Sequence, residues 1–153
     1  MKNRIILGAL LGLLFFGYHA QAQTEEQAIK KAIMTMFDGM RAGDSAMVHS
    51  VFTDQVIFQR IQDVPTDGAE VVNSDFNNFL KAVGTPHDEV WDERIEFGPI
   101  HIDGNMASAW VPFKFYSGTT FSHCGVNSFQ LYRAEDGWKI FHLVDTSRRT
   151  DCK

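Results

Sequence analysis

Hydrophobic and polar residues alternate along two neighbouring stretches near the end of the chain, residues 121–132 and 138–145. Because successive side chains of a strand point to opposite faces, this alternation predicts two β-strands, and residues 134–137 predict the hairpin turn between them. One parity of each strand would line a concave surface with aromatic, aliphatic and a few polar side chains. Its members are Phe121, His123, Gly125, Asn127, Phe129 and Leu131 in the first strand, and Trp138, Ile140, His142 and Val144 in the second.

Helical spacing dominates the region before these strands. Apolar residues recur at helical intervals in residues 24–40 and again in residues 72–83, and a short second helix begins at Asp44. Residues 55–61 are rich in β-branched and aromatic side chains and predict a strand, and the segments after Pro86 predict further strands. This order predicts an α+β domain in which helices cover one face of a curved antiparallel sheet.

The first 22 residues have the layout of a cleavable secretory signal. Lys2 and Arg4 precede an apolar run, residues 5–16, and Ala20-Gln21-Ala22 places small residues on both sides of a polar one. The apolar run is shorter than the ~20 residues that a membrane-spanning helix needs, although an uncleaved anchor is the alternative. We therefore expect a signal peptide, residues 1–22, and an exported domain, residues 23–153, in the periplasm or outside the cell and free of the membrane.

The domain that remains is small and acidic. Removing residues 1–22 takes away two of the fourteen basic residues, so twelve basic residues face nineteen acidic ones and the net charge is −7. The remaining 131 residues fit one domain. An acidic domain without a stripe of lysine and arginine is poorly suited to a phosphate backbone, so we expect no nucleic-acid partner.

Two motifs carry a resemblance to a known superfamily: Ala42-Gly43-Asp44 after the first helix and Asp136-Gly137-Trp138-Lys139-Ile140 at the start of the last strand. Together with the order of elements they resemble the nuclear transport factor 2-like superfamily, and more closely its small exported SnoaL-like and ketosteroid isomerase-like members. The resemblance covers residues 23–153. It implies a cystatin-like cone, in which N-terminal helices close over the concave face of a bent sheet around an apolar cavity, and commonly a homodimer.

The isomerase branch of this superfamily uses a tyrosine on the first helix, a base aspartate on the first strand and a protonated aspartate on the third strand of the meander. Laying the motifs over this sequence puts Met36, Arg60 and Asn127 at those positions. Only Asn127 keeps a hydrogen-bonding role, so the resemblance implies no steroid-type isomerase chemistry.

Three polar residues are candidates to contact a ligand. His123 and Asn127 lie four residues apart on one predicted strand, hence on one face and about 13 Å apart, where they could hold two ends of one ligand. His142 shares the predicted face of Trp138 and Ile140 and could meet either residue across the ladder. Each histidine could serve as an acid or base near neutral pH, or could be a packed structural side chain.

Arg60 is an unusual residue for the first strand. Val56, Phe58 and Arg60 share one parity, so if Phe58 faces the cavity, Arg60 does too. A buried guanidinium needs a carboxylate, from a ligand or from the protein, where Asp145 is a possible partner. The alternative is that Arg60 lies at the strand end and reaches water.

The two cysteines, Cys124 and Cys152, are better suited to a disulfide than to a metal site. Alternation points Cys124 away from His123, and no compact ligand spacing is present, so we expect neither a metal nor a cofactor. The same geometry argues against a cysteine nucleophile paired with His142. Export permits oxidation, and we predict a disulfide that straps the C-terminal tail across the outer face of the sheet; the alternative is two free thiols and a frayed tail.

Residues 106–116 predict a strand that is apolar on both faces. Phe113 and Phe115 share one parity, while Trp110 and Pro112 share the other. A partner subunit would cover the outer face, which predicts a homodimer. The alternative is a bulge at Pro112 that switches the parity and turns Trp110 inward.

These patterns predict an exported protein that binds a small apolar molecule with polar ends. The alternatives are an enzyme of isomerase, dehydratase or hydrolase type with His123 or His142 as general base, and an oligomerisation module that uses its sheet. An enclosed polar cluster in the cavity would favour the binding protein or the enzyme. A filled cavity together with an apolar outer face of the sheet would favour the oligomerisation module. The predicted ligand-binding residues are Phe58, Arg60, Trp110, Phe113, Phe115, His123, Asn127, Phe129 and His142.

Overall fold

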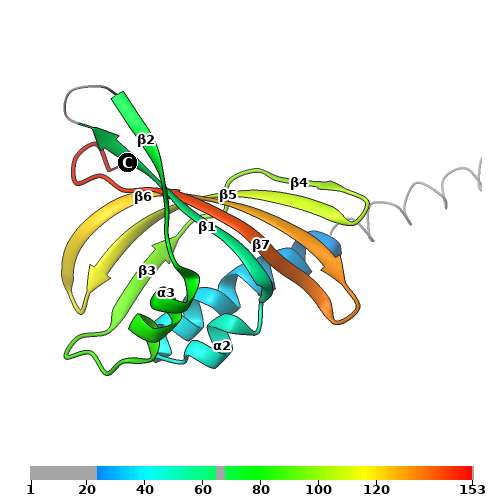
Figure 1. The fold of residues 1–153 in the computed structure, drawn as a ribbon, viewed down its shortest axis with the longest axis horizontal. Coiled ribbons are helices and arrows are strands. Elements are labelled where there is room, and N and C mark those ends of the chain that lie inside the picture. The colour runs from blue at the N-terminus through cyan, green and yellow to red at the C-terminus, as the bar shows by residue number, and fades with distance from the viewer. Residues whose placement is uncertain (1–23, 65–67, 153) are drawn as a thin grey trace, which may run out of the picture.

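The helices all lie on one side of a curved sheet, as Figure 1 shows. The computed structural model describes residues 24–64 and 68–152, so the predicted signal peptide lies outside the described residues. Within those residues, no helix is long and apolar enough to cross a membrane. The elements are an N-terminal helix (residues 24–42), α2 (Ser45–His49), β1 (Phe52–Val64), β2 (Gly68–Asn73), α3 (Phe76–Gly84), β3 (Trp91–Ile95), β4 (Ile100–Asp103), β5 (Met106–Ser117), β6 (Thr120–Ala134) and β7 (Gly137–Thr146).

The Ala42-Gly43-Asp44 motif ends one helix and starts the next. Gly43 has a φ of 67°, a left-handed conformation that favours glycine after a helix, and the Asp44 amide donates to the Gly39 carbonyl at 2.8 Å. The Asp44 carboxylate then accepts a hydrogen bond from the Met47 amide at 2.9 Å and caps α2. The motif therefore turns the chain between two packed helices within three residues.

The sheet has the strand order β2-β1-β7-β6-β5-β3, and β4 also pairs with β5. Neighbouring strands are antiparallel except for β1 and β7, which run parallel. The N-terminal helix, α2 and α3 cover one face of this sheet. The predicted α+β architecture, with helices over a curved and mainly antiparallel sheet, is confirmed.

The core fills the space between the N-terminal helix and the central strands. Apolar side chains at helical spacing on residues 24–42 are buried, and they meet the inward parity of β5, β6 and β7. Phe37 packs edge-to-face on Phe129, with ring centroids 6.3 Å apart. Phe129, which we expected to contact a ligand, is fully buried in this core.

A β-bulge changes the parity of β7. Leu131 of β6 pairs with Ile140, but its neighbour Gln130 pairs with His142, so Phe141 is an extra residue in β7. As a result Ile140 and Leu143 are both buried on the inner side, and His142 points to the outer side. The prediction that His142 shares a face with Ile140 is wrong, because alternation restarts after the bulge.

One other prediction and one alternative fail at the level of elements. The helix predicted to begin near Val72 begins at Phe76, because the Asp75 carboxylate caps it by accepting from the amides of Asn77 at 2.8 Å and Asn78 at 3.2 Å. Val72 belongs to β2 instead, where it pairs with Arg60. The bulge at Pro112 is also absent, since β5 pairs with β6 in unbroken register from Met106 to Phe115.

Candidate functional site

A cavity of about 280 Å³ lies where the N-terminal helix and α3 cover the inner face of the sheet. Most of its wall is apolar, and the remainder is a polar group of side chains from four strands and the segment before α3. The apolar lining consists of Met36, Met40, Phe58, Phe79, Trp91, Phe115 and Leu143. The polar lining consists of Arg60, Ser74, Glu93, His123, Asn127 and Asp145.

Arg60 and Asp145 form an ion pair at one side of the cavity. They are paired residues of the parallel strands β1 and β7, so their side chains leave the same face of the sheet. Arg60 Nε donates to Asp145 Oδ1 at 2.8 Å, and Nη2 donates to Oδ2, which makes the contact bidentate. The Arg60 guanidinium therefore has Asp145 as its carboxylate partner, which was the possible partner within the protein. The Arg60 side chain is also 46% exposed, so it reaches water as the alternative predicted.

Glu93 and Asn127 form the second polar pair. Glu93 projects from β3 and Asn127 from β6, on either side of β5, and Asn127 Nδ2 donates to Glu93 Oε1 at 2.7 Å. Burial of the Glu93 carboxyl raises its pKa to about 7, against the opposing effect of the Asn127 hydrogen bond. The negative charge of Asp145 raises the pKa further, while Arg60 lowers it. Glu93 is therefore close to half protonated at neutral pH.

His123 lies on β6 between two phenylalanine rings. Its imidazole stacks on Phe115, with ring centroids 5.0 Å apart, and meets Phe113 edge-on at 5.7 Å. Nδ1 lies 3.1 Å from Ser122 Oγ, within hydrogen-bond distance. Burial lowers the pKa of His123, and the charge of Arg60 lowers it further. The imidazole is thus neutral at pH 7.

The structure brings some of the predicted ligand-binding residues together and separates others. Phe58, Arg60, Phe115, His123 and Asn127 all line the cavity. Phe113 lies behind His123 and Phe129 lies in the core, so neither belongs to the cavity wall.

Trp110 and His142 lie on the opposite face of the sheet. Trp110 is 51% exposed, because β5 keeps its alternation and the even-numbered positions of this strand point outward. His142 is turned outward by the bulge at Phe141, and its Nε2 lies 3.0 Å from Gln59 Oε1. These two residues therefore cannot contact a ligand in this cavity.

Sequence reasoning missed Glu93, which is the most perturbed acid of the site. A signal was present, because Trp91, Glu93 and Ile95 share one parity of β3 and place a charge between two large apolar side chains. A carboxyl in such a position is buried only where a partner accepts or donates a hydrogen bond. That partner, Asn127, lies two strands away and could be identified only from the register.

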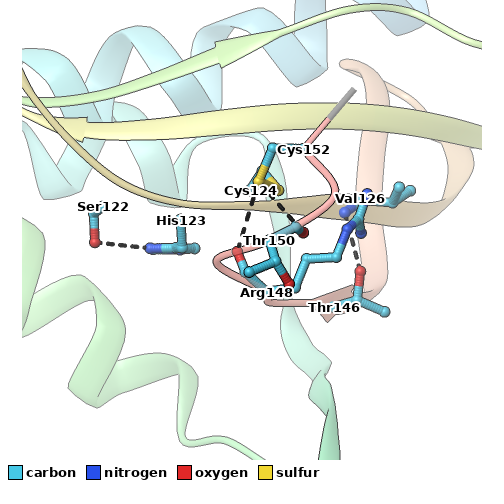
Figure 2. Close-up of a disulfide and its surroundings, with 8 residues drawn as sticks. All are labelled: Ser122, His123, Cys124, Val126, Thr146, Arg148, Thr150 and Cys152. Atoms are coloured by element: carbon cyan, nitrogen blue, oxygen red, sulfur yellow. Dashed lines mark hydrogen bonds between the residues drawn. A yellow bond between two sulfur atoms is a disulfide. The ribbon is translucent and has the colours of Figure 1, made fainter.

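The disulfide between Cys124 and Cys152 is present beside the site, with the two Cα atoms 5.8 Å apart (Figure 2). The tail does not simply cross the outer face. It first continues the register of β7, since Cys124 and Arg148 exchange backbone hydrogen bonds of 2.9 and 2.8 Å, and then turns back at Asp151, which has a φ of 54°. Cys124 is buried under this tail, immediately next to His123.

The described residues contain no group of three or more His, Cys, Asp or Glu side chains that could hold a metal ion. Ordinary acid–base and hydrogen-bonding groups are what the cavity offers. Neutral His123, the half-protonated Glu93 and the amide of Asn127 could orient a polar ligand atom, and the rings of Phe58, Phe79, Trp91 and Phe115 could contact an apolar one.

Helices closed over a bent sheet, with a mixed polar and apolar cavity between them, define a domain of the NTF2-like class with a cystatin-like fold. Residues 24–144 match the family model described as "Putative lumazine-binding", and the chain belongs to that family. No curated protein is similar enough to this chain to count as a relative.

Solved structures support the same fold at low sequence identity. An NTF2-like protein of unknown function from Shewanella baltica has a TM-score of 0.63 and 15% identity, over 83% of this chain and 96% of its own. A domain of unknown function with a cystatin-like fold from Nostoc punctiforme has a TM-score of 0.64 and 15% identity, over 84% of this chain and 80% of its own. A protein from Streptomyces avermitilis is described as a putative dehydratase from the NTF2-like family. It has a TM-score of 0.59 and 16% identity, over 83% of this chain and 98% of its own.

Proposed function

We propose that the chain is an exported protein that binds a small, largely apolar molecule with polar ends in the cavity between its helices and its sheet. The observation that carries this proposal is the cluster of polar side chains among the apolar walls of the cavity: Arg60, Glu93, His123, Asn127 and Asp145. Few, convergent polar groups in an otherwise apolar pocket are typical of small-molecule sites.

The size of the cavity limits the ligand. A volume of about 280 Å³ lies just below the range of typical drug-sized sites, and it corresponds to roughly nine waters at the density of liquid water. One or two fused rings fit this volume. The aromatic walls favour a planar ring system, which agrees with the lumazine in the description of the family.

Isothermal titration calorimetry with lumazine as the probe tests this proposal. Ser74 lines the cavity and its residue is exposed, so Ser74→Trp would add a large ring to the cavity with little strain on the core. Thr119→Trp places the same ring on an exposed turn and is the matched control. We expect lumazine to bind the wild type and Thr119→Trp equally and to bind Ser74→Trp at least tenfold more weakly. If lumazine bound all three proteins equally, it would not bind in this cavity, and the proposed site would be wrong.

A second candidate function is acid–base catalysis, and the position of Glu93 favours it. A carboxyl whose pKa is about 7 can both take and give a proton at neutral pH, and it lies in the same cavity as His123. The dehydratase description of the Streptomyces avermitilis protein agrees with such a role. Exchange of the α-protons of a small cyclic ketone in deuterated water, followed by NMR, would detect it. Loss of exchange in Glu93→Gln, with exchange unchanged in His142→Phe, is the expected result.

We also propose that the chain forms a homodimer through the outer face of the sheet, the surface that an oligomerisation module would use. Met106, Trp110 and Tyr132 point outward from β5 and β6 and are 52%, 51% and 39% exposed. Large apolar side chains grouped on one open sheet face are typical of an interaction site. Analytical ultracentrifugation should give about twice the monomer mass for the wild type and the monomer mass for Trp110→Lys. A wild-type monomer at micromolar concentration would contradict the dimer.

Export is supported by the layout of residues 1–22 alone. The intact mass of the protein recovered from outside the cytoplasm of its host should correspond to a chain that begins at Gln23. A mass that includes Met1 would contradict cleavage at this position.

A further inference from the structure

We infer that the cavity takes an uncharged ligand with a hydrogen-bond acceptor, such as a carbonyl oxygen, and that the acid form of Glu93 donates the hydrogen bond that holds this acceptor. The inference rests on the proposed small-molecule function and gives it a ligand class and a specificity-determining residue. Three features of Glu93 and its surroundings support this inference: a carboxyl oxygen that is free to bind a ligand, the compensated charges around the carboxyl, and the apolar walls of the cavity.

One oxygen of the Glu93 carboxyl is available to a ligand. Oε1 accepts the 2.7 Å hydrogen bond from Asn127, and Asn127 is the one hydrogen-bond partner of the Glu93 carboxyl among the described residues. No buried side-chain nitrogen or oxygen of those residues lacks a partner, so Oε2, which has none, is accessible, and Glu93 lines the cavity. When the proton is on Oε2, this atom is a donor aimed at the ligand space.

The charges around Glu93 already balance without it. Arg60 from β1 is held in a bidentate pair by Asp145 from β7, so the two charges compensate each other. His123 from β6 is neutral at pH 7, since burial lowers its pKa. The helices that cover the cavity contribute only apolar side chains to it, Met36, Met40 and Phe79. The cavity is therefore uncharged when Glu93 is protonated and carries one negative charge when it is ionised.

An apolar ligand shifts this balance toward the acid form. Filling the cavity displaces water from Glu93, and loss of water disfavours the ionised carboxylate. A cationic ligand would require the ionised form of Glu93, because the ion pair of Arg60 and Asp145 leaves no other uncompensated negative charge in the lining. An anionic ligand would find no uncompensated positive charge there for the same reason. The neutral acceptor is the class that all the polar groups accommodate.

Three probes of one size separate these classes: 1-tetralone, which is neutral with a carbonyl, tetralin, which lacks the carbonyl, and the cation of 2-aminotetralin. Their affinities would be measured by calorimetry at about pH 6 and about pH 8.5. If only the acid form of Glu93 binds the ketone, a pKa of about 7 predicts roughly 30-fold weaker binding at the higher pH. We expect tetralin to bind more weakly than the ketone at pH 6 and with little pH dependence.

Glu93→Gln tests the assignment to this residue. Glutamine has nearly the same shape as the acid form and stays neutral, so its amide can donate at every pH. We expect this variant to bind 1-tetralone with similar affinity at both pH values. Glu96→Gln, which removes an exposed glutamate just beyond the end of β3, is the matched control and should keep the wild-type pH dependence.

The outcomes distinguish this inference from the function on which it rests. If no probe binds the wild type at either pH, the proposed small-molecule function fails for this class of ring, and the inference fails with it. If the ketone binds equally or more tightly at pH 8.5, or if 2-aminotetralin binds more tightly than the ketone at pH 6, the cavity binds ligands but the role of Glu93 is wrong. Unchanged pH dependence in Glu93→Gln would also overturn it. Thermal melts of each variant verify folding.

Discussion

The two faces of the sheet use the same strands in different ways. Along β5, Ala107, Ala109 and Val111 point inward and are buried, whereas Met106 and Trp110 of the same strand are about half exposed. The inner face meets helices, which fill one part of it with a core and leave a cavity over the rest. The outer face has no such layer of helices among the described residues, and the C-terminal tail covers it at Cys124. Position on the inner face therefore decides which polar residues can reach a ligand.

The largest expected effect comes from truncating the inner face. Phe129→Ala removes a fully buried ring that packs on Phe37, and such a change costs about 3 to 5 kcal/mol of the free energy of unfolding. Tyr132→Ala, three positions along β6 and exposed on the outer face of the single chain, should cost less than about 1 kcal/mol when both variants also carry Trp110→Lys, which removes the proposed dimer contact. Urea denaturation measures both. Similar losses for the two variants would contradict the contrast between the faces.

The disulfide is the next largest contribution. Replacing Cys124 and Cys152 together by serine opens a loop with a sequence separation of 28, and the chain-entropy model predicts a loss of about 3 to 4 kcal/mol. Thermal denaturation of the double variant should also match that of the reduced wild type. No change in the unfolding free energy would show that the tail is bound to β6 by its other contacts.

The buried acid of the inner face makes stability depend on pH. Because the pKa of Glu93 is raised from its ordinary value near 4.5 to about 7 in the folded protein, the unfolded chain loses this proton first as pH rises. The contribution of protonated Glu93 to the free energy of unfolding is fully present below pH 4.5 and is lost as the pH rises from about 4.5 to about 7. The loss is at most about 3 kcal/mol. Denaturation across this range should show a smaller loss for Glu93→Gln, and an identical profile would contradict the burial of an ionisable group at this position.

The ion pair of Arg60 and Asp145 should contribute little to stability. Its arginine is about half exposed, so solvent screens the attraction and Arg60→Gln should cost about 1 kcal/mol or less. Asp136→Asn, which removes the exposed partner of Lys139 and keeps the hydrogen bond from Lys139 to the Ser50 carbonyl, should cost still less. Chemical denaturation of both variants measures the difference. A loss above about 3 kcal/mol at Arg60 would mean that the pair is buried more deeply than its exposure indicates.

The smallest effects separate the two histidines. His123 lines the cavity, and His142 lies on the outer face beside Gln59. His123→Phe should weaken the binding of lumazine at least severalfold, while His142→Phe should change its dissociation constant less than twofold. The opposite order would mean that the ligand binds on the outer face.

The sequence could predict the fold because periodicity alone identifies most of the elements. Helical spacing in residues 24–40 and alternation from His123 to Leu131 in β6 correctly predicted which side chains point inward. Phe121 was wrongly predicted to share that face, because the register shifts between Phe115 and Tyr116, and the inward face of β5 was left open. β2 was missed because its residues are nearly all exposed, so no alternation of burial marks it. Its Val72 happened to continue the helical spacing of the residues that follow.

The site could be predicted only in part, because it depends on pairing between strands. His123 and Asn127 were found from alternation within one strand, and Arg60 from its parity with Phe58. His142 was misplaced because the bulge at Phe141 arises from the register between β6 and β7, which leaves no mark in the local pattern. Glu93 was missed for a related reason, since its partner is two strands away.

The central claim is that a ligand enters the inner face and leaves the outer face untouched, and methyl NMR measures this directly. Met36 and Met40 line the cavity, while Met106 lies on the outer face and Met47 on α2. With methyl-labelled methionine and lumazine as the probe, the account predicts that the signals of Met36 and Met40 shift with saturation while those of Met106 and Met47 stay in place. Shifts at Met106 with none at Met36 and Met40 would contradict it.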